Sequence, residues 1–174
     1  DLVDRGDASP GATDFIALLP LPASATADAL QGTAGDDIFL VDDIGDWITE
    51  AAGAGFDRVE TTLDSYTLAG NVEELIRRGG ADFTGNGNAL ANAAIGGAGS
   101  DTLGGLGGND DIAGNSGDDI LAGGNGEDLL RGQSGADLLI GGWQSDTLTG
   151  GAGADRLIGD QEWLSSQGAN DRLD

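Results

Sequence analysis

Aspartates recur every nine residues through the second half of the chain. A carboxylate is a hard anionic oxygen ligand, and calcium takes about six to eight such oxygens at about 2.3–2.6 Å. Each aspartate stands five residues after a glycine and two residues before a leucine or isoleucine. The spacing therefore predicts a repeated cation site. The aspartates are Asp101, Asp110, Asp119, Asp128, Asp137, Asp146 and Asp155.

The segment from Gly96 to Ile158 consists of contiguous nonapeptides. They read GGAGSDTLG, GLGGNDDIA, GNSGDDILA, GGNGEDLLR, GQSGADLLI, GGWQSDTLT and GGAGADRLI. Position 1 is always Gly, position 6 Asp and position 8 Leu or Ile, whereas position 4 is Gly except at Gln144. The pattern is G-G-x-G-x-D-x-U-x, where U is a large aliphatic residue.

This pattern predicts short strands joined by glycine-rich turns. In a strand successive side chains point to opposite faces, so the last three residues of each repeat turn only position 8 inward. Positions 1 to 6 then reverse the chain, and their glycines let the backbone approach an ion closely. The predicted inward column is Leu103, Ile112, Leu121, Leu130, Leu139, Leu148 and Leu157.

The repeats resemble those of the RTX (repeats-in-toxin) family. The resemblance implies an all-β fold, a parallel β-roll or β-solenoid with two repeats per coil. One row of turns then carries Asp101, Asp119, Asp137 and Asp155, and the other carries Asp110, Asp128 and Asp146. Each calcium ion lies between two stacked turns and takes aspartates and backbone carbonyls from both. The carbonyl ligands fall on Gly97, Gly99, Gly105, Gly107, Gly108, Gly114, Asn115, Ser116, Gly117, Gly123, Gly124, Asn125, Gly126, Gly132, Gln133, Ser134, Gly135, Gly141, Trp143, Gly150 and Ala152.

The chain before the regular repeats divides into three segments. Residues 1–31 form an N-terminal strap or linker, in which Phe15 to Leu21 is an edge strand or an extended strap. Residues 32–60 read as a degenerate first block with metal ligands Asp37 and Asp57, a looser repeat at Asp46, and two extra residues, Glu50 and Ala51. This block is expected to hold one or two ions.

Residues 61–95 resemble the metal-poor connecting coils of the family. We expect a wider core there, and a polar ladder of Asn86, Asn88 and Asn92 in the turns. Asn92 takes the position-6 place and is neutral, so the site that it shares with Asp110 is expected to be weak or empty. The predicted core residues are Leu63, Tyr66, Leu68, Val72, Leu75 and Ile76.

The main roll spans 96–174, with an insertion near 160–167. The repeat resumes with Asp171 as a further ligand, stacked on Asp146. Strand positions that point outward form an apolar face, which the strap, the Trp163 loop or a second molecule could cover. The alternative is a set of scattered exposed aliphatic residues. The face consists of Ile120, Leu138, Ile140 and Ile158.

Composition limits the functions that the chain can have. Its 174 residues carry 31 acidic and 7 basic side chains, a net charge of −24, so binding to nucleic acid or to an anionic membrane is disfavoured. Cysteine is absent, no signal peptide is visible, and no apolar run is long enough to span a membrane. The abrupt start and the partial final motif indicate a fragment of a larger protein.

Three classes of function remain. The first is a module that binds roughly five to eight calcium ions, is disordered at sub-micromolar calcium, and folds outside the cell. In the resembled family this permits type I secretion, so the expected location is extracellular or at the bacterial surface, with calcium and the larger parent protein as partners. The second is an enzyme, but histidine is absent and the acidic pairs Asp36–Asp37 and Asp118–Asp119 lie in predicted metal turns, so catalysis is not expected here. The third is a self-associating adhesive or surface-layer module; a metal-free solenoid with solvated acidic turns is a further alternative.

Overall fold

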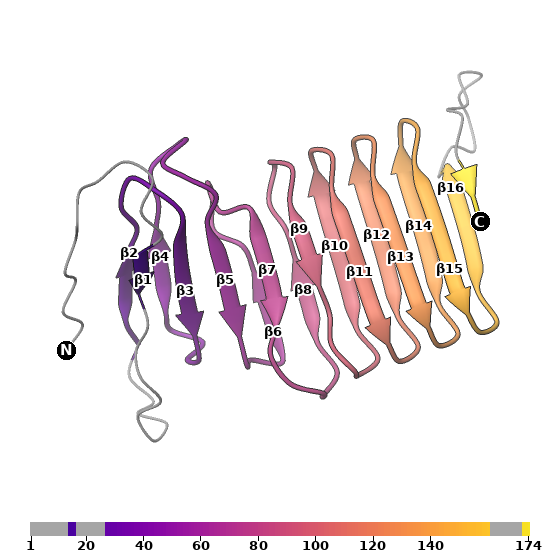
Figure 1. The fold of residues 1–174 in the computed structure, drawn as a ribbon, viewed down its shortest axis with the longest axis horizontal. Coiled ribbons are helices and arrows are strands. Elements are labelled where there is room, and N and C mark those ends of the chain that lie inside the picture. The colour runs from indigo at the N-terminus through magenta and orange to yellow at the C-terminus, as the bar shows by residue number, and fades with distance from the viewer. Residues whose placement is uncertain (1–13, 17–26, 161–171) are drawn as a thin grey trace.

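The computed structural model describes residues 14–16, 27–160 and 172–174. Within these ranges every regular element is a β-strand, and the strands stack side by side along the long axis of the molecule (Figure 1). All pairings are parallel. The predicted all-β parallel β-roll is confirmed.

The strands form two long sheets and one short one. The first sheet contains β1 (Asp14–Ile16), β3 (Asp37–Val41), β5 (Arg58–Thr61), β7 (Glu74–Arg77), β9 (Ala93–Ile95), β11 (Asp111–Ser116), β13 (Leu129–Ser134), β15 (Thr147–Ala152) and β17 (Arg172–Leu173). The second contains β6 (Ser65–Thr67), β8 (Thr84–Asn86), β10 (Thr102–Gly107), β12 (Ile120–Asn125), β14 (Leu138–Trp143) and β16 (Arg156–Asp160). The third pairs β2 (Ala29–Gln31) with β4 (Trp47–Thr49).

The register shows that two nonapeptides make one coil. Leu103 pairs with Leu121 in one sheet and Ile112 with Leu130 in the other, so partners are 18 residues apart. Successive repeats therefore alternate between the two sheets. A given position of the repeat stacks on the same position one coil later.

The core is a column of position-8 side chains between the sheets. The six predicted residues from Leu103 to Leu148 are at most 1% exposed, and Leu157 is partly buried at the end of the stack. Burying a side chain of this size contributes about 1.5–3 kcal/mol. In the earlier coils the core widens to include Phe39, Phe83 and Leu75.

Two expectations about the elements were wrong. The regular strands have six residues rather than three, because they continue through position 3 of the next repeat. The pairing is interrupted at position 1, and position 2 takes a positive φ, such as 80° at Asn115 and 77° at Gln133. In the connecting coils Ile76 is only partly buried, and the neighbouring Arg77 is buried instead.

The structure tests only part of what the sequence predicted for the N-terminal strap, the apolar face and the C-terminal insertion. Asp14–Ile16 pairs with β3, so this part of the predicted strap is an edge strand of the first sheet rather than a cover for the apolar face. On that face Ile120 is 44% exposed, and Leu138, Ile140 and Ile158 are half-buried. The rest of the strap, the insertion with Trp163, and Asp171 lie outside the described residues.

Candidate metal centre

The position-6 aspartates stack in two columns, one at each end of the strands. The backbone N–H of Asp101 donates to Oδ1 of Asp119 at 2.8 Å, and that of Asp119 donates to Oδ1 of Asp137 at 2.9 Å. The same bond joins Asp110 to Asp128 at 2.8 Å in the other column. One carboxylate oxygen of each coil is thus fixed by the coil before it. Further bonds of this kind run from Asp128 to Asp146 and from Asp137 to Asp155.

The position-1 glycines make room for these carboxylates. A Cβ atom on Gly114 would lie 2.1 Å from Oδ2 of Asp119, and one on Gly105 would lie 2.0 Å from Oδ2 of Asp110. Any other residue would therefore displace the acid. This explains why the glycine five residues before each aspartate does not vary along the regular repeats.

The columns contain buried oxygens without a hydrogen-bond partner. Burial removes solvating water from a charge, and an unpartnered buried polar atom costs about 1–3 kcal/mol or more. Among the described residues, Arg58 and Arg131 pair with Glu74 and Asp111, which lie outside the columns. The unpartnered atoms are Oδ1 of Asp101 and Oδ2 of Asp57, Asp110, Asp119, Asp128 and Asp137.

Burial also shifts the acidity of the columns. It raises the pKa of Asp110 to about 7 and that of Asp119 to about 6, and the charges of stacked aspartates add to both shifts. The pKa values of Asp101, Asp128 and Asp137 are raised for the same main reason. Carboxylates at this spacing, about 4.8 Å between strands, favour a bound divalent cation. The donor set fits calcium, a hard ion that prefers oxygen ligands.

The predicted carbonyl residues stand at positions 1 to 4 of the repeats, and positions 1 to 3 belong to the ends of the regular strands. The position-2 N–H of Gly97 donates to Oδ2 of Asp101 at 2.7 Å, which orients the acid within its own turn. The position-3 carbonyls of Ser134 and Ala152 accept from position-4 N–H groups one coil earlier, at 2.9 and 3.0 Å. Gln144, the one non-glycine at position 4, has a φ of 79°.

The connecting coils replace the aspartates with other side chains. Asn92 occupies the column as predicted: its N–H donates to Oδ1 of Asp110 at 2.8 Å, and its Nδ2 donates to the carbonyl of Val72 at 3.1 Å. Asn88 donates its N–H to Oδ1 of Asn92. Asn86 lies apart and bonds Thr67, so the predicted three-residue ladder is wrong in that member.

The column that begins at Asp101 is preceded, one coil earlier, by the ring of Phe83 and the buried guanidinium of Arg77. The carbonyl of Phe83 accepts from the N–H of Thr102, the contact that Asp101 makes one coil later, and the Phe83 ring lies 5.6 Å beneath the Arg77 guanidinium. Arg77 is 7% exposed and lowers the pKa of Asp101, against the larger effect of burial. Sequence reasoning missed Arg77.

In the first block, residues 32–60, the turns of Asp37 and Asp57 stack as the regular coils do, whereas the turn of Asp46 does not. The N–H of Asp37 donates to Oδ1 of Asp57 at 2.8 Å, and both side chains are fully buried. Asp46 lies elsewhere and accepts from the N–H of Asp28 at 2.9 Å. Glu50, which sequence reasoning treated as an insertion, lies beside Asp37 and Asp57. The sequence feature that could have identified Glu50 is its place directly after β4, at position 1 of the repeat, where the regular repeats have glycine.

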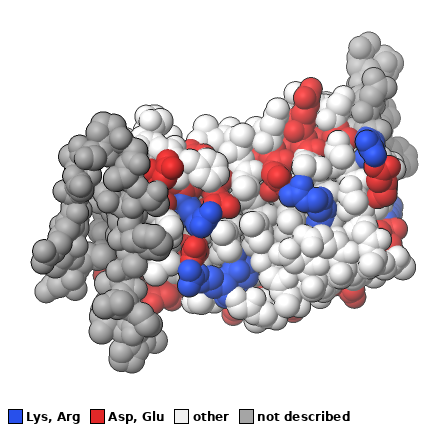
Figure 2. Space-filling view, in the orientation of Figure 1, with Lys and Arg blue, Asp and Glu red and all other residues white. Residues whose placement is uncertain are grey.

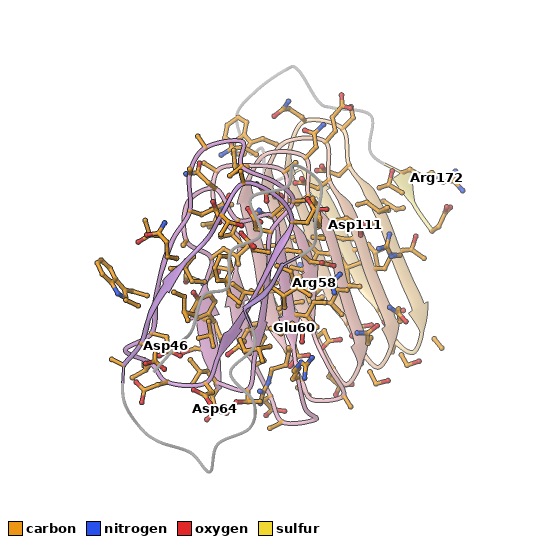
Figure 3. The ribbon with its side chains drawn as sticks, turned by 60° about the vertical axis from the view of Figure 1, so that its left-hand side comes forward. Asp46, Arg58, Glu60, Asp64, Asp111 and Arg172 are labelled. Atoms are coloured by element: carbon orange, nitrogen blue, oxygen red, sulfur yellow. The ribbon has the colours of Figure 1, made fainter. Side chains whose placement is uncertain are left out.

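The outer surface of the first sheet is charged. Arg58 contacts Glu60 and Glu74, and Arg78 contacts Glu60. On the face shown in Figure 2, basic side chains lie beside acidic ones. Figure 3 labels Arg58 and Glu60 on β5, Asp111 on β11 further along the same sheet, and Arg172 at the far end of the stack. The arginines of these pairs are partly exposed, whereas Glu60 and Glu74 are each only 8% exposed.

Comparison with known protein families assigns the chain to a class. The sequence model of the RTX calcium-binding nonapeptide repeat matches four times, at residues 23–41, 86–121, 114–148 and 122–157. The matches cover more than half of the chain, which therefore belongs to the RTX calcium-binding repeat family. It is a calcium-binding β-roll module, and the repeat family to which it belongs is of a structural, non-catalytic kind. No curated protein matches the sequence, and among the described residues no helix has the length and apolar character of a membrane span.

Proposed function

We propose that this module couples folding to extracellular calcium and so supports the export and stability of a larger secreted bacterial protein. The observation that carries the proposal is the two columns of buried aspartates with unpartnered oxygens. Such columns repel when they are ionised and become stable when cations lie between them. Calcium concentration then decides whether the chain folds.

The predicted ligands complete this proposal. Ions lie between Asp101 and Asp119, Asp119 and Asp137, Asp137 and Asp155, Asp110 and Asp128, and Asp128 and Asp146, with carbonyls of the intervening turns. Residues 32–60 form a first calcium block, 61–95 a metal-poor connector, and 96–174 the main block.

The size of the calcium effect is sufficient for a folding switch. Extracellular calcium modules have dissociation constants of about 10⁻⁴–10⁻³ M. At ~1–10 mM calcium a ~10⁻⁴ M site adds roughly 1.4–2.7 kcal/mol, so about six sites add roughly 8–16 kcal/mol. This equals the whole stability of an ordinary domain. At sub-micromolar calcium the same sites add almost nothing, which keeps the chain unfolded for type I secretion.

The proposal is tested by measuring chain dimensions against calcium. We expect the radius of gyration to fall from roughly 44 Å, typical of an unfolded chain of this length, to half of that or less in millimolar calcium. Small-angle scattering with magnesium as the control ion measures this change. A chain that is equally compact in calcium, magnesium and chelator would refute the proposal.

A second function, self-association through the roll, is favoured by one observation. Ile120 and Trp143 are 44% and 55% exposed on neighbouring strands of the second sheet. Large exposed apolar side chains commonly mark interfaces. Light scattering of the calcium-loaded protein distinguishes the two cases, since a purely folding-linked module stays monomeric at all concentrations.

A further inference from the structure

Glu50 lies at a turn position that belongs to glycine in the regular coils. Gln31 pairs with Thr49, so Glu50 stacks beside Gly32 of the preceding coil. A Cβ atom on Gly32 would lie 1.5 Å from Oε2 of Glu50. In a regular repeat the space over this glycine is filled by the aspartate of the same turn, as Asp119 fills it over Gly114. The first block therefore brings an additional carboxylate to the ends of its stacked turns.

Three carboxylates converge there. One oxygen from each of Asp37, Glu50 and Asp57 lies within 4.8 Å of the other two, and the side chains are 1%, 8% and 0% exposed. No other group of three potential metal ligands meets this criterion among the described residues.

Two of these oxygens are buried without a partner. Oε1 of Glu50 accepts from the N–H of Ala51 at 2.7 Å, and Oδ1 of Asp57 accepts from the N–H of Asp37 at 2.8 Å. Oε2 of Glu50 and Oδ2 of Asp57 have no hydrogen-bond partner. Asp37 is oriented by the N–H of Thr33, which donates to its Oδ2 at 2.7 Å.

Among the residues that the structure describes, no basic side chain forms an ion pair with this cluster. Arg58, which follows Asp57 directly, turns to the outer face and contacts Glu60 and Glu74. Burial raises the pKa of Glu50 to about 7, and the charges of Asp57 and Asp37 add to the shift. A polyvalent cation bound by oxygen atoms satisfies both the charge and the unpartnered atoms.

We propose that Asp37, Glu50 and Asp57 form a three-carboxylate cation pocket, distinct from the two-aspartate pockets of the regular repeats, that binds its ion first and accepts a trivalent ion in preference to calcium. The proposal deepens the calcium-dependent function and rests on it. Its physical basis is charge: ligand charge sets the affinity of oxygen-based calcium sites. A third carboxylate leaves net negative charge around a divalent ion and balances a trivalent one.

The first test is a calcium titration of the full chain with paired variants. Glu50→Gln is expected to weaken the tightest binding step roughly ten-fold or more, because it removes one charged ligand. Glu127→Gln removes an exposed glutamate from a regular repeat and should leave that step unchanged. Asp119→Asn should weaken later steps only.

The outcomes separate this proposal from the proposed function. A Glu50→Gln titration that superimposes on wild type, while Asp119→Asn alters binding, overturns the pocket and leaves the folding role intact. A wild-type chain that binds no calcium refutes the folding role.

The second test does not depend on how the variant folds. The wild-type chain is labelled with ¹³C at the glutamate side-chain carboxyls, folded in excess calcium and titrated with lanthanum(III). The regular pockets contain aspartates only. Glu73 also lies beside this cluster, because its Oε2 accepts from the N–H of Asp57 at 2.8 Å. The Glu50 carboxyl resonance is therefore assigned individually, and a ligand shift at that resonance identifies the three-carboxylate pocket. We expect the Glu50 resonance to move with the first equivalent of lanthanum; a Glu50 resonance that does not move overturns the proposal.

Discussion

The regular coils of residues 96–158 and the connecting coils of residues 61–95 belong to the same two stacked sheets but fill their turns differently. In the regular coils, aspartates such as Asp110 and Asp119 are buried with an oxygen left unpartnered. In the connecting coils, Asn92 bonds backbone carbonyls through its amide, and Arg77 supplies a buried positive charge beside Phe83. A β-roll turn can thus be completed by an external cation or by the chain itself.

This difference has a consequence for how stability depends on conditions. Turns completed by an ion are stable only when the ion is present, because binding free energy adds directly to folding free energy. Turns that Asn92 or Arg77 complete need no bound ion, because the hydrogen-bond donor or positive charge belongs to the chain. Substitutions on either side of this boundary should therefore differ in how their cost depends on calcium.

Removing one inner aspartate should have the greatest effect. Asp119 bonds the coil before it and is bonded to the coil after it, so Asp119→Asn weakens two proposed pockets. At ~1–10 mM calcium we expect a loss of about 3–5 kcal/mol in the free energy of unfolding. Urea denaturation measures it. Asp118→Asn, an exposed neighbour, is the control, and equal losses for the two variants would contradict the assignment.

Acidification should fold the calcium-free chain. The pKa values of Asp57, Asp110 and Asp119 are raised by burial to about 6, 7 and 6 in the folded state. A raised carboxyl pKa means that the folded state binds more protons, so the stabilisation is full below the unfolded pKa and is lost as pH rises through about 6–7. Calcium-stripped protein should gain strand structure between roughly pH 8 and pH 5.

Calcium should reverse this dependence. Its ligands must be ionised, so the calcium-loaded protein should lose stability as pH falls through the same range. Thermal unfolding of calcium-free and calcium-loaded samples across this pH range gives the slope of the melting temperature against pH for each. If both slopes have the same sign, the buried aspartates are not the groups that bind calcium.

Replacing the buried Arg77 should destabilise the connecting coils by the same amount with and without calcium. Arg77 donates from Nη1 to the carbonyl of Arg78 at 2.9 Å and covers Phe83. Arg77→Met should cost about 1–3 kcal/mol, because it leaves the partly buried carbonyl of Arg78 and the carboxylate of Asp101 without their positive neighbour. The exposed Arg131→Met is the matched control and should cost less than about 1 kcal/mol. A loss for Arg77→Met that grows with calcium concentration would show that the two regions are not distinct.

The smallest effect should come from the irregular repeat. Gln144 has a φ of 79°, which an L-residue other than glycine adopts at a cost of about 1–2 kcal/mol. Gln144→Gly should therefore stabilise the calcium-loaded protein by about 1 kcal/mol in urea denaturation. Gly126→Ala provides the opposite control, since a Cβ there would lie 1.8 Å from the carbonyl oxygen of Gly108. Destabilisation by Gln144→Gly would show that the glutamine side chain has another role.

The sequence predicted the regular coils because each position of the nonapeptide has one physical task. Leu121 fills the core, Asp119 faces the turn, and Gly114 leaves room for it. A strict period makes the register follow from the spacing alone. The length of the strands was underestimated because their second half consists mostly of glycine and polar residues, which carry little strand signal.

The earlier coils were less predictable because their contacts are specific to one place. Arg77 is buried through a ring and two carbonyls that come from different parts of the chain. Glu50 looked like an insertion, since its partners Asp37 and Asp57 are adjacent only after the coils have stacked. A residue of the wrong type at a position that the repeat reserves for glycine was the available signal for Glu50.

The most direct test of the account is the far-ultraviolet circular dichroism of the chain at neutral pH, in millimolar calcium and then in excess EGTA. If the aspartate columns are stable only with cations between them, the strand spectrum present in calcium is lost in EGTA and returns when calcium is restored. A strand spectrum that is unchanged in EGTA would contradict the account, because the buried carboxylates would then be tolerated without any ion.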